Sequence, residues 1–143
     1  MRWRYPVFIC LITAFGLVPA AGKAEGVSVR DPWIRQAPPG ATVMAGYLEL
    51  RNSTSRPQVL EAASSTGFAS VMMHRTVVRD GMAGMEHLSR IELAPNASLI
   101  FAPGGNHLML MNPKQALRAG DVVVVKLEFQ GGLVLPVTFA VRQ

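Results

Sequence analysis

The sequence predicts an all-β protein, a single-domain β-sandwich of Greek-key type. Short apolar or alternating runs recur along the chain, and turn-forming stretches separate them at regular spacing. Only 112–121, NPKQALRAGD, could hold a helical turn. The chain has 143 residues, half of them apolar, and no repeat, low-complexity tract or linker divides it. One domain with one hydrophobic core is therefore expected.

The strands are expected where period-two alternation or a short apolar run lies between two turn signals. They are, in chain order, 27–35, 42–52, 58–63, 70–78, 85–93, 97–101, 107–111, 122–129 and 133–141. The intervening breaks read APPGA, RNSTSRP, RDGMAG, APNAS, APGGN and FQGG. In the last break, Gly131 and Gly132 can supply the positive φ angles of a tight turn, so the final two strands are expected to form a hairpin.

The first 24 residues are expected to be a secretory signal peptide that is removed from the mature protein. Arginines precede an apolar run over 7–18, and small residues follow it. A run of about a dozen apolar residues is shorter than the ~20 that a membrane-spanning helix needs. Cleavage is expected after Ala24, with Gly22 as the alternative, which leaves 25–143 as the mature domain of an exported protein.

Charge and cysteine content exclude several functions once the leader is gone. The whole chain has 14 Lys and Arg against 9 Asp and Glu, and the leader removes three of the cations, which leaves 11 against 9. No basic cluster remains to bind nucleic acid or a membrane surface. The only cysteine, Cys10, lies in the leader, and the bulky Ile9 before it argues against lipid attachment. A disulfide, a thiolate metal site, a blue-copper centre and a cysteine nucleophile are all excluded.

Histidine and methionine cluster in one part of the chain. All three histidines, His74, His87 and His107, lie in the segment from Met72 to Met111, with six of the seven methionines beyond Met1. Thioether sulfur is a poor ligand for zinc, calcium or magnesium and a good one for Cu(I), whereas imidazole binds both oxidation states of copper. A His/Met site without cysteine therefore indicates copper, with Cu(I) preferred and Cu(II) left open.

The stretch NHLMLMNP shows how such a site could be built. In a β-strand, His107, Met109 and Met111 point to one face, and Leu108 and Leu110 point to the other. The leucines can enter the core while the imidazole and the thioethers face a metal ion.

The spacing of four residues resembles the signature of a known family. His74 is followed by ten residues and Met85, then by twenty-one residues and His107, then by one residue and Met109. This pattern resembles the periplasmic copper chaperones of the PCu(A)C type, as do DPWIRQAPPGATVMAGYLELRN near the mature start and HLMLMNPKQALRAGD after the site.

The resemblance implies a cupredoxin-like sandwich in which His74, Met85, His107 and Met109 bind Cu(I). It implies delivery of copper to the copper-bearing subunit of cytochrome c oxidase or to Sco-type assembly proteins. The protein is then a monomer, with no stable membrane association and no enzymatic activity. Because the chain stops at Gln143 without a Met/His-rich tail, one principal site is expected.

Other donors and another function are also compatible with parts of the sequence. Met85 lies in a glycine-rich loop that could close over the metal, and Met82 is its rival. Met82 and His87 are expected to be solvated loop residues, with a transient docking set for incoming copper as the alternative. Met72 and Met111 are expected to pack in the core or beside the ligands, Met44 and Met73 to fill the interior, and Trp33 to anchor the core, with an interaction surface near the metal as the alternative for Trp33. A hydrolase lacks a nucleophile motif, and a copper oxygenase lacks an N-terminal histidine. The alternative function is a metal-free secreted adaptor or adhesion module.

Overall fold

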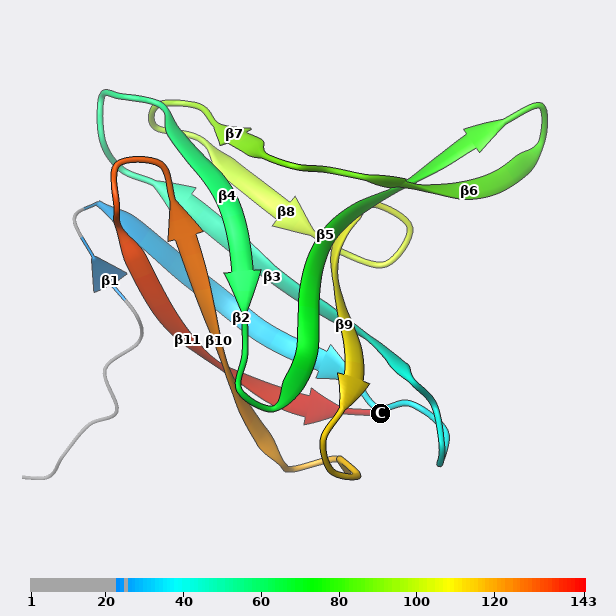
Figure 1. The fold of residues 1–143 in the computed structure, drawn as a ribbon. Helices are drawn as coiled ribbons and strands as arrows, with labels where there is room; N and C mark the ends of the chain where they lie inside the picture. Colours follow the sequence, from blue (N-terminus) through cyan, green and yellow to red (C-terminus); the bar gives the residue numbers. More distant parts are fainter. Residues whose placement is uncertain (1–22, 25) are drawn as a thin grey trace, which may run out of the picture.

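The structure is a computed structural model that describes residues 23, 24 and 26–143, and every regular element in this part of the chain is a strand. The strands are β1 (Lys23–Ala24), β2 (Val27–Arg35), β3 (Val43–Asn52), β4 (Gln58–Ser64), β5 (Phe68–Arg79), β6 (Met82–His87), β7 (Ile91–Leu93), β8 (Ser98–Phe101), β9 (Asn106–Pro113), β10 (Val122–Phe129) and β11 (Val134–Arg142) (Figure 1). The all-β class and the single domain predicted from the sequence are confirmed. No described helix could cross a membrane.

Hydrogen bonding joins the layers of the sandwich into one sheet that closes on itself. The strands follow the order β6-β5-β9-β8-β3-β2-β11-β10-β4-β7, with further pairings between β9 and β3 and between β5 and β4. The last pairing, Ala63 opposite Val71, completes the circuit. Neighbours are antiparallel except for β11 beside β2 and β8 beside β9. The arrangement is therefore barrel-like, and β6 and β7 lie outside the closed part.

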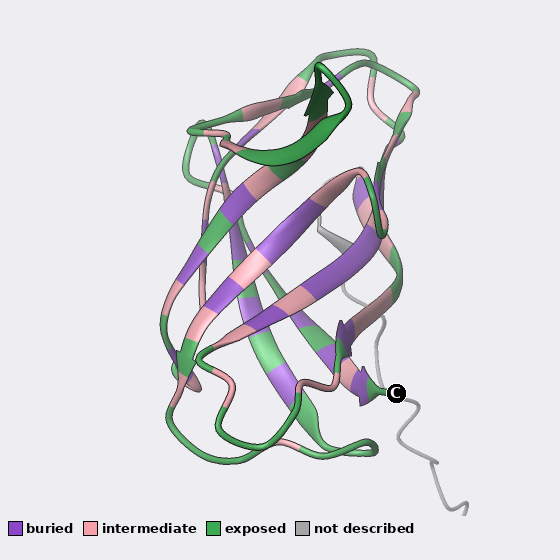
Figure 2. Cartoon of the chain, turned by 90° about the vertical axis from the view of Figure 1, so that its right-hand side faces the viewer, coloured by how far each residue is buried: buried purple, intermediate pink, exposed green. Residues whose placement is uncertain are grey.

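The core lies inside this barrel, and alternation is most regular in the last two strands. In β10, buried Val123, Val125, Leu127 and Phe129 alternate with exposed or half-buried residues, β11 alternates in the same way, and Figure 2 shows this banding along the strands. Burying a large apolar side chain contributes roughly 1.5–3 kcal/mol, so a core of this kind needs no disulfide.

The glycine turn after β10 is confirmed, because Gly131 and Gly132 have φ angles of 90° and 91°. A second tight turn joins β5 to β6. Asp80 and Gly81 have φ angles of 52° and 75°, as the two central residues of a type I′ turn require. The β5–β6 hairpin that this turn closes projects from the body of the molecule (Figure 1).

Two details differ from the predicted elements. The single strand expected over 85–93 is two strands, because β6 pairs with β5 whereas β7 crosses to pair with β4. A period-two pattern cannot distinguish these cases, since both halves alternate. The helical turn considered for 112–121 does not form: Asn112 and Pro113 extend β9, and the following residues form bends and a turn.

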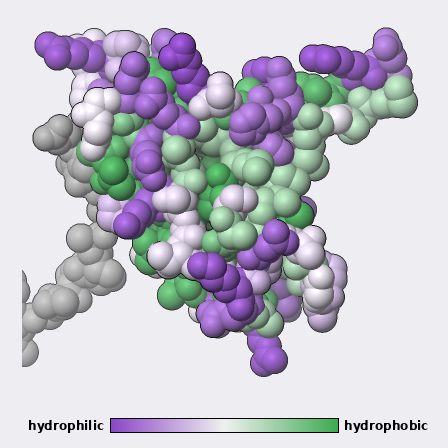
Figure 3. All heavy atoms as spheres, viewed as in Figure 1, coloured by the Kyte–Doolittle hydropathy of each residue, from purple (hydrophilic) through white to green (hydrophobic). Residues whose placement is uncertain are grey.

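The projecting hairpin is mostly exposed. Figure 3 shows hydrophobic residues along its lower side and hydrophilic ones above them. Val78, Met82 and Met85 are exposed large hydrophobic residues of this arm. The two strands of this arm also contain His74 and His87.

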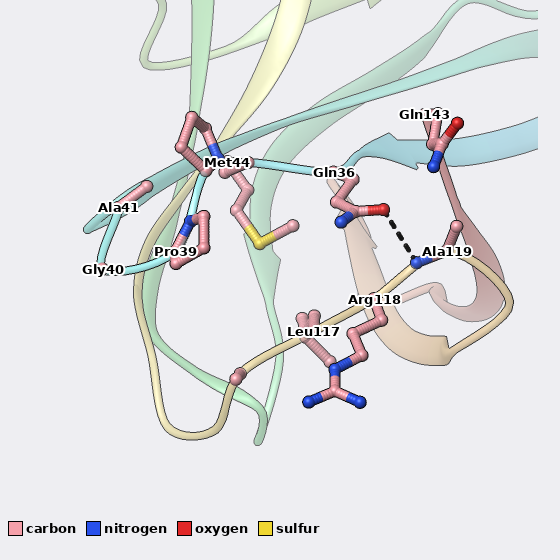
Figure 4. A pocket seen from close by; sticks show the side chains of 12 residues that line it. Gln36, Pro39, Gly40, Ala41, Met44, Leu117, Arg118, Ala119 and Gln143 are labelled. Atoms are coloured by element: carbon pink, nitrogen blue, oxygen red, sulfur yellow. Dashed lines mark hydrogen bonds between the residues drawn. The ribbon is translucent and has the colours of Figure 1, made fainter.

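A cavity of about 470 Å³ lies near the C-terminal end of β9, where loop 36–41 faces residues 116–119 (Figure 4). The Ala119 amide donates a hydrogen bond to Gln36 Oε1 across it, at 3.0 Å. Met44 is the only sulfur-bearing residue that lines this cavity, and no histidine does. Met44 is buried in the core, as predicted. The cavity is therefore not where the His/Met cluster gathers.

Candidate metal centre

The candidate metal centre is formed on β6, β5 and β9, which lie side by side in that order. The register places His74 opposite His107, and Met72 opposite Met109. Side chains at opposed positions share a sheet face, and positions two apart along a strand do too. All four residues therefore lie on one face, which we call the His/Met face.

Burial shows that the His/Met face is the outer one. Leu108 and Leu110 are fully buried in the core, and Met73 is almost fully buried. Met109, by contrast, is half-buried. The predicted alternation of β9 is therefore confirmed. Met72 is 39% exposed, so the structure excludes the core as its place and leaves the other expected role, packing beside the proposed ligands; it lies opposite Met109 and has the parity of His74.

His107 is held in one orientation by its neighbour. Its side chain is 7% exposed, and Nδ1 lies 3.1 Å from the Gly105 carbonyl oxygen. Because that oxygen can only accept, Nδ1 carries the proton and donates. This tautomer leaves the lone pair of Nε2 available, which is the arrangement common to histidines that bind metals.

His74 is prepared for a ligand in a different way. Its ring centroid is 6.0 Å from that of His107, with the planes at 84°. Its Nδ1 atom is buried without a hydrogen-bond partner, although the residue as a whole is half-buried. Such an unpaired nitrogen costs about 1–3 kcal/mol, which bonding to a metal ion would relieve. Burial, and after it the nearby His87 and His107, lower the pKa of His74 below its usual 6.5, which favours the neutral form that binds metals.

Met85 belongs to the same face but lies farther out along the hairpin. It pairs with Thr76, two residues from His74, and is 64% exposed. The expected mobile loop is thus a strand. Met82, its rival, has the opposite parity on β6 and points away from the His/Met face. The register therefore favours Met85 over Met82.

The structure places His87, not Met85, directly opposite His74. The two ring centroids are 5.4 Å apart, with the planes at 88°. The sequence interpretation of His87 as a solvated loop residue missed this pairing. The signal was present: with Asp80 and Gly81 as the two turn residues, counting outward pairs 79 with 82 and 74 with 87.

No carboxylate faces the cluster from its own strands. Glu86 lies on the opposite face of β6 and pairs with Arg75, at 3.1 Å and exposed. Among residues 26–143, no group of three His, Cys, Asp or Glu side chains is already arranged to hold an ion. The site as it stands therefore offers uncharged nitrogen and sulfur donors, which suits a soft metal ion better than zinc or calcium.

Trp33 was expected in the core, but it is half-buried and packs on the outer side of β3. Its ring lies 4.7 Å from that of Tyr47, and the Arg35 guanidinium is 5.9 Å from its centroid. Arg142 lies at a similar distance over Trp33 and pairs with Asp31 at 2.7 Å. The expectation failed because an aromatic ring can be covered by arginines without entering the core.

The fold and this face define a class: a small all-β domain that presents histidines and methionines on one sheet face. The chain belongs to the family described as "Putative lipoprotein LpqE-like", whose model matches residues 27–141. It is 33% identical over 121 residues to "Putative lipoprotein Lxx21020" of Leifsonia xyli, covering 84% of this chain and 72% of that protein.

Solved structures share the fold. The copper-bound PCuAC domain from PmoF2 superposes with a TM-score of 0.72 at 25% identity, over 85% of this chain and 97% of that one. The solution structure of CuI-DR1885 from Deinococcus radiodurans gives a TM-score of 0.64 at 29% identity, over 78% of this chain and 74% of that one. The fold of this chain is thus the fold of PCuAC domains.

Proposed function

We propose that this protein is a copper chaperone that binds Cu(I) through His74, Met85, His107 and Met109. The observation that carries the proposal is the cross-strand pair of His74 and His107, one with an unpaired buried nitrogen and the other with Nε2 left free. Met109 stands on the same face two residues from His107. Copper in two structural neighbours supports the choice of metal.

Two imidazoles and two thioethers form an uncharged site of individually weak ligands. Thioethers favour Cu(I) over Zn(II), which supports Cu(I) as the preferred ion. Ligands of this kind can be replaced one at a time by those of a partner, so transfer should proceed by associative exchange. The function is binding and transfer, and we assign the protein no catalytic activity.

Met85 completes the site only if the hairpin bends toward His107. The arm is suited to this, because β6 pairs with β5 alone and its residues are mostly exposed. Segments with few buried contacts open at low free-energy cost. Closing of the β5–β6 hairpin over the ion would bring Met85 to the metal, and opening would release it.

We further propose export to the periplasm, where the copper-bearing subunit of cytochrome c oxidase or Sco-type assembly proteins would accept the ion from a monomeric chaperone. The lipoprotein names of the family and of the Leifsonia relative support export. The predicted signal peptide and Cys10 lie outside the described residues, apart from Lys23 and Ala24 in β1. Cleavage without lipid attachment stays a prediction.

Titration of the purified protein with Cu(I), followed by X-ray absorption spectroscopy, tests the proposal. We expect one ion per chain with both sulfur and nitrogen in its first shell. A shell of nitrogen and oxygen alone, or no binding, would overturn it. The second outcome would favour the metal-free adaptor, the alternative function that the sequence leaves open.

A further inference from the structure

The His/Met face contains more imidazoles than the proposed Cu(I) site uses. His87, His74 and His107 lie in a row across β6, β5 and β9, because each is the direct register partner of the next. The ring centroids are 5.4 Å and 6.0 Å apart along this row. Opposed residues of neighbouring antiparallel strands have Cβ atoms only about 5 Å apart, so His87 and His107, on either side of His74 and about 10 Å from each other, can both turn toward an ion that lies above His74.

The hairpin strand thus offers two different donors to one site. Met85 and His87 are two residues apart on β6 and share the His/Met face, while Met82 does not. A thioether suits Cu(I), whereas Cu(II) prefers nitrogen and oxygen donors in a tetragonal arrangement. The donor that β6 provides can therefore differ with the oxidation state of the ion.

We propose that this face also binds Cu(II), through His74, His87 and His107, with water completing the coordination. Cu(I) uses Met85 and Met109 with His74 and His107, so His87 is specific to Cu(II). The inference rests on the proposed function, because it concerns the same face of the sheet. It assigns a ligand role to a histidine that lies outside the four-residue signature.

The three rings differ in how far they must move. His107 is fixed by Gly105, and His74 already has an unpaired nitrogen. No three His, Cys, Asp or Glu side chains among the described residues are yet arranged to hold one ion, so His87 has to turn about its side-chain bonds. Its side chain is exposed, and only its contact with His74 and its hydration oppose this rotation. Glu86 is held on the opposite face by Arg75 and does not compete.

The test compares His87→Gln with two other variants of the same strand, each titrated separately with Cu(I) and with Cu(II). Pulsed electron paramagnetic resonance counts the imidazoles on Cu(II), and competition with chelators gives both affinities. We expect His87→Gln to lower the Cu(II) affinity at least about tenfold, since groups that merely orient ligands already contribute 10- to 100-fold. The count should fall from three imidazoles to two, with the Cu(I) affinity unchanged.

The other variants give the matched comparisons. Met85→Leu should weaken Cu(I) binding and leave Cu(II) binding unchanged, and Met82→Leu on the opposite face should alter neither. An imidazole count that is the same in His87→Gln as in the parent, or a parent that binds Cu(II) with fewer than three imidazoles, overturns the inference. Failure of the parent to bind Cu(I) is a separate result and would instead reject the chaperone proposal.

Discussion

At the scale of single residues, β9 separates ligand from core by parity alone. His107 and Met109, two of the proposed ligands, lie on the His/Met face, whereas Leu108 and Leu110 on the other face are fully buried. We expect His107→Ala and Met109→Ala to abolish one-to-one Cu(I) binding while circular dichroism shows an intact fold. The matched control is Leu108→Ala, which should cost about 2–5 kcal/mol of stability and leave the ligands in place. A ligand variant that unfolds outright, or binds as tightly as the parent, would show that the face is wrongly assigned.

The histidines also make binding depend on pH. His74 has a folded-state pKa below 6.5, so its neutral form stabilises the native state above about pH 6.5, and that stabilisation is lost as the pH falls through the folded pKa. We therefore expect the metal-free protein to lose stability on acidification, and His74→Gln to reduce the loss, as measured by urea unfolding at several pH values.

Protons compete with copper at the same nitrogens. We expect the Cu(I) affinity to fall below roughly pH 6–6.5, approaching a tenfold loss per pH unit for each histidine still bound. Because the pKa of His74 is lowered, proton competition at His74 should begin at a lower pH. Thioethers do not titrate. A competition titration with an affinity that is flat from about pH 7 to about pH 5 would exclude both histidines from the site and leave only methionine ligands.

At the scale of elements, the β5–β6 hairpin depends on its two turn residues. Gly81 has a φ of 75°, and a Cβ there would meet no atom within 4 Å, so Gly81→Ala adds backbone strain of about 1 kcal/mol without a clash. We expect a several-fold loss of Cu(I) affinity with little change in the melting temperature of the barrel. Gly40→Ala is the control, since Gly40 has a φ of 80° and equal space but lies in loop 36–41. Equal losses in both variants would exclude a role for the hairpin.

The same elements show what the sequence could predict. Strands β2 and β10 have the predicted bounds, because turn residues flank both. In β10, alternation also specifies the inner face, whereas in β2 a register shift between Arg30 and Trp33 interrupts it. Single-strand periodicity says nothing of pairing partners, so it predicts one strand over 85–93 where β6 and β7 lie, and it does not place His87 opposite His74. The Asp80–Gly81 turn fixes the register, and recognising it as a two-residue turn would have paired His74 with His87. The core position predicted for Trp33 is wrong, because a pattern of apolar alternation does not show that arginine side chains cover the ring.

At the scale of the whole molecule, the closed sheet and the projecting hairpin contribute different donors to the proposed site. Strands β5 and β9 belong to the closed circuit, so His74, His107 and Met109 are held on a rigid wall. Strand β6 lies outside the circuit and contributes the exposed donors. In the proposed function both properties are useful, because donors fixed in the closed sheet would keep their places around the ion, while an arm paired with β5 alone could open to let the ion leave.

This division predicts how the entire fold responds to metal. An ion that binds only the native state raises the free energy of unfolding by RT ln(1 + [L]/Kd), about 2.7 kcal/mol at a hundredfold excess over Kd. For a domain of this size that corresponds to an increase in melting temperature of roughly 10 °C. We expect Cu(I) to produce it in a calorimetric scan under reducing conditions, and Zn(II) at the same concentration to produce much less. Because three of the four proposed ligands lie on β5 and β9, two strands of the closed circuit, His107→Ala should remove the shift. A metal-free adaptor would show no shift with either ion, and a zinc shift equal to that of Cu(I) would contradict the proposed preference for copper.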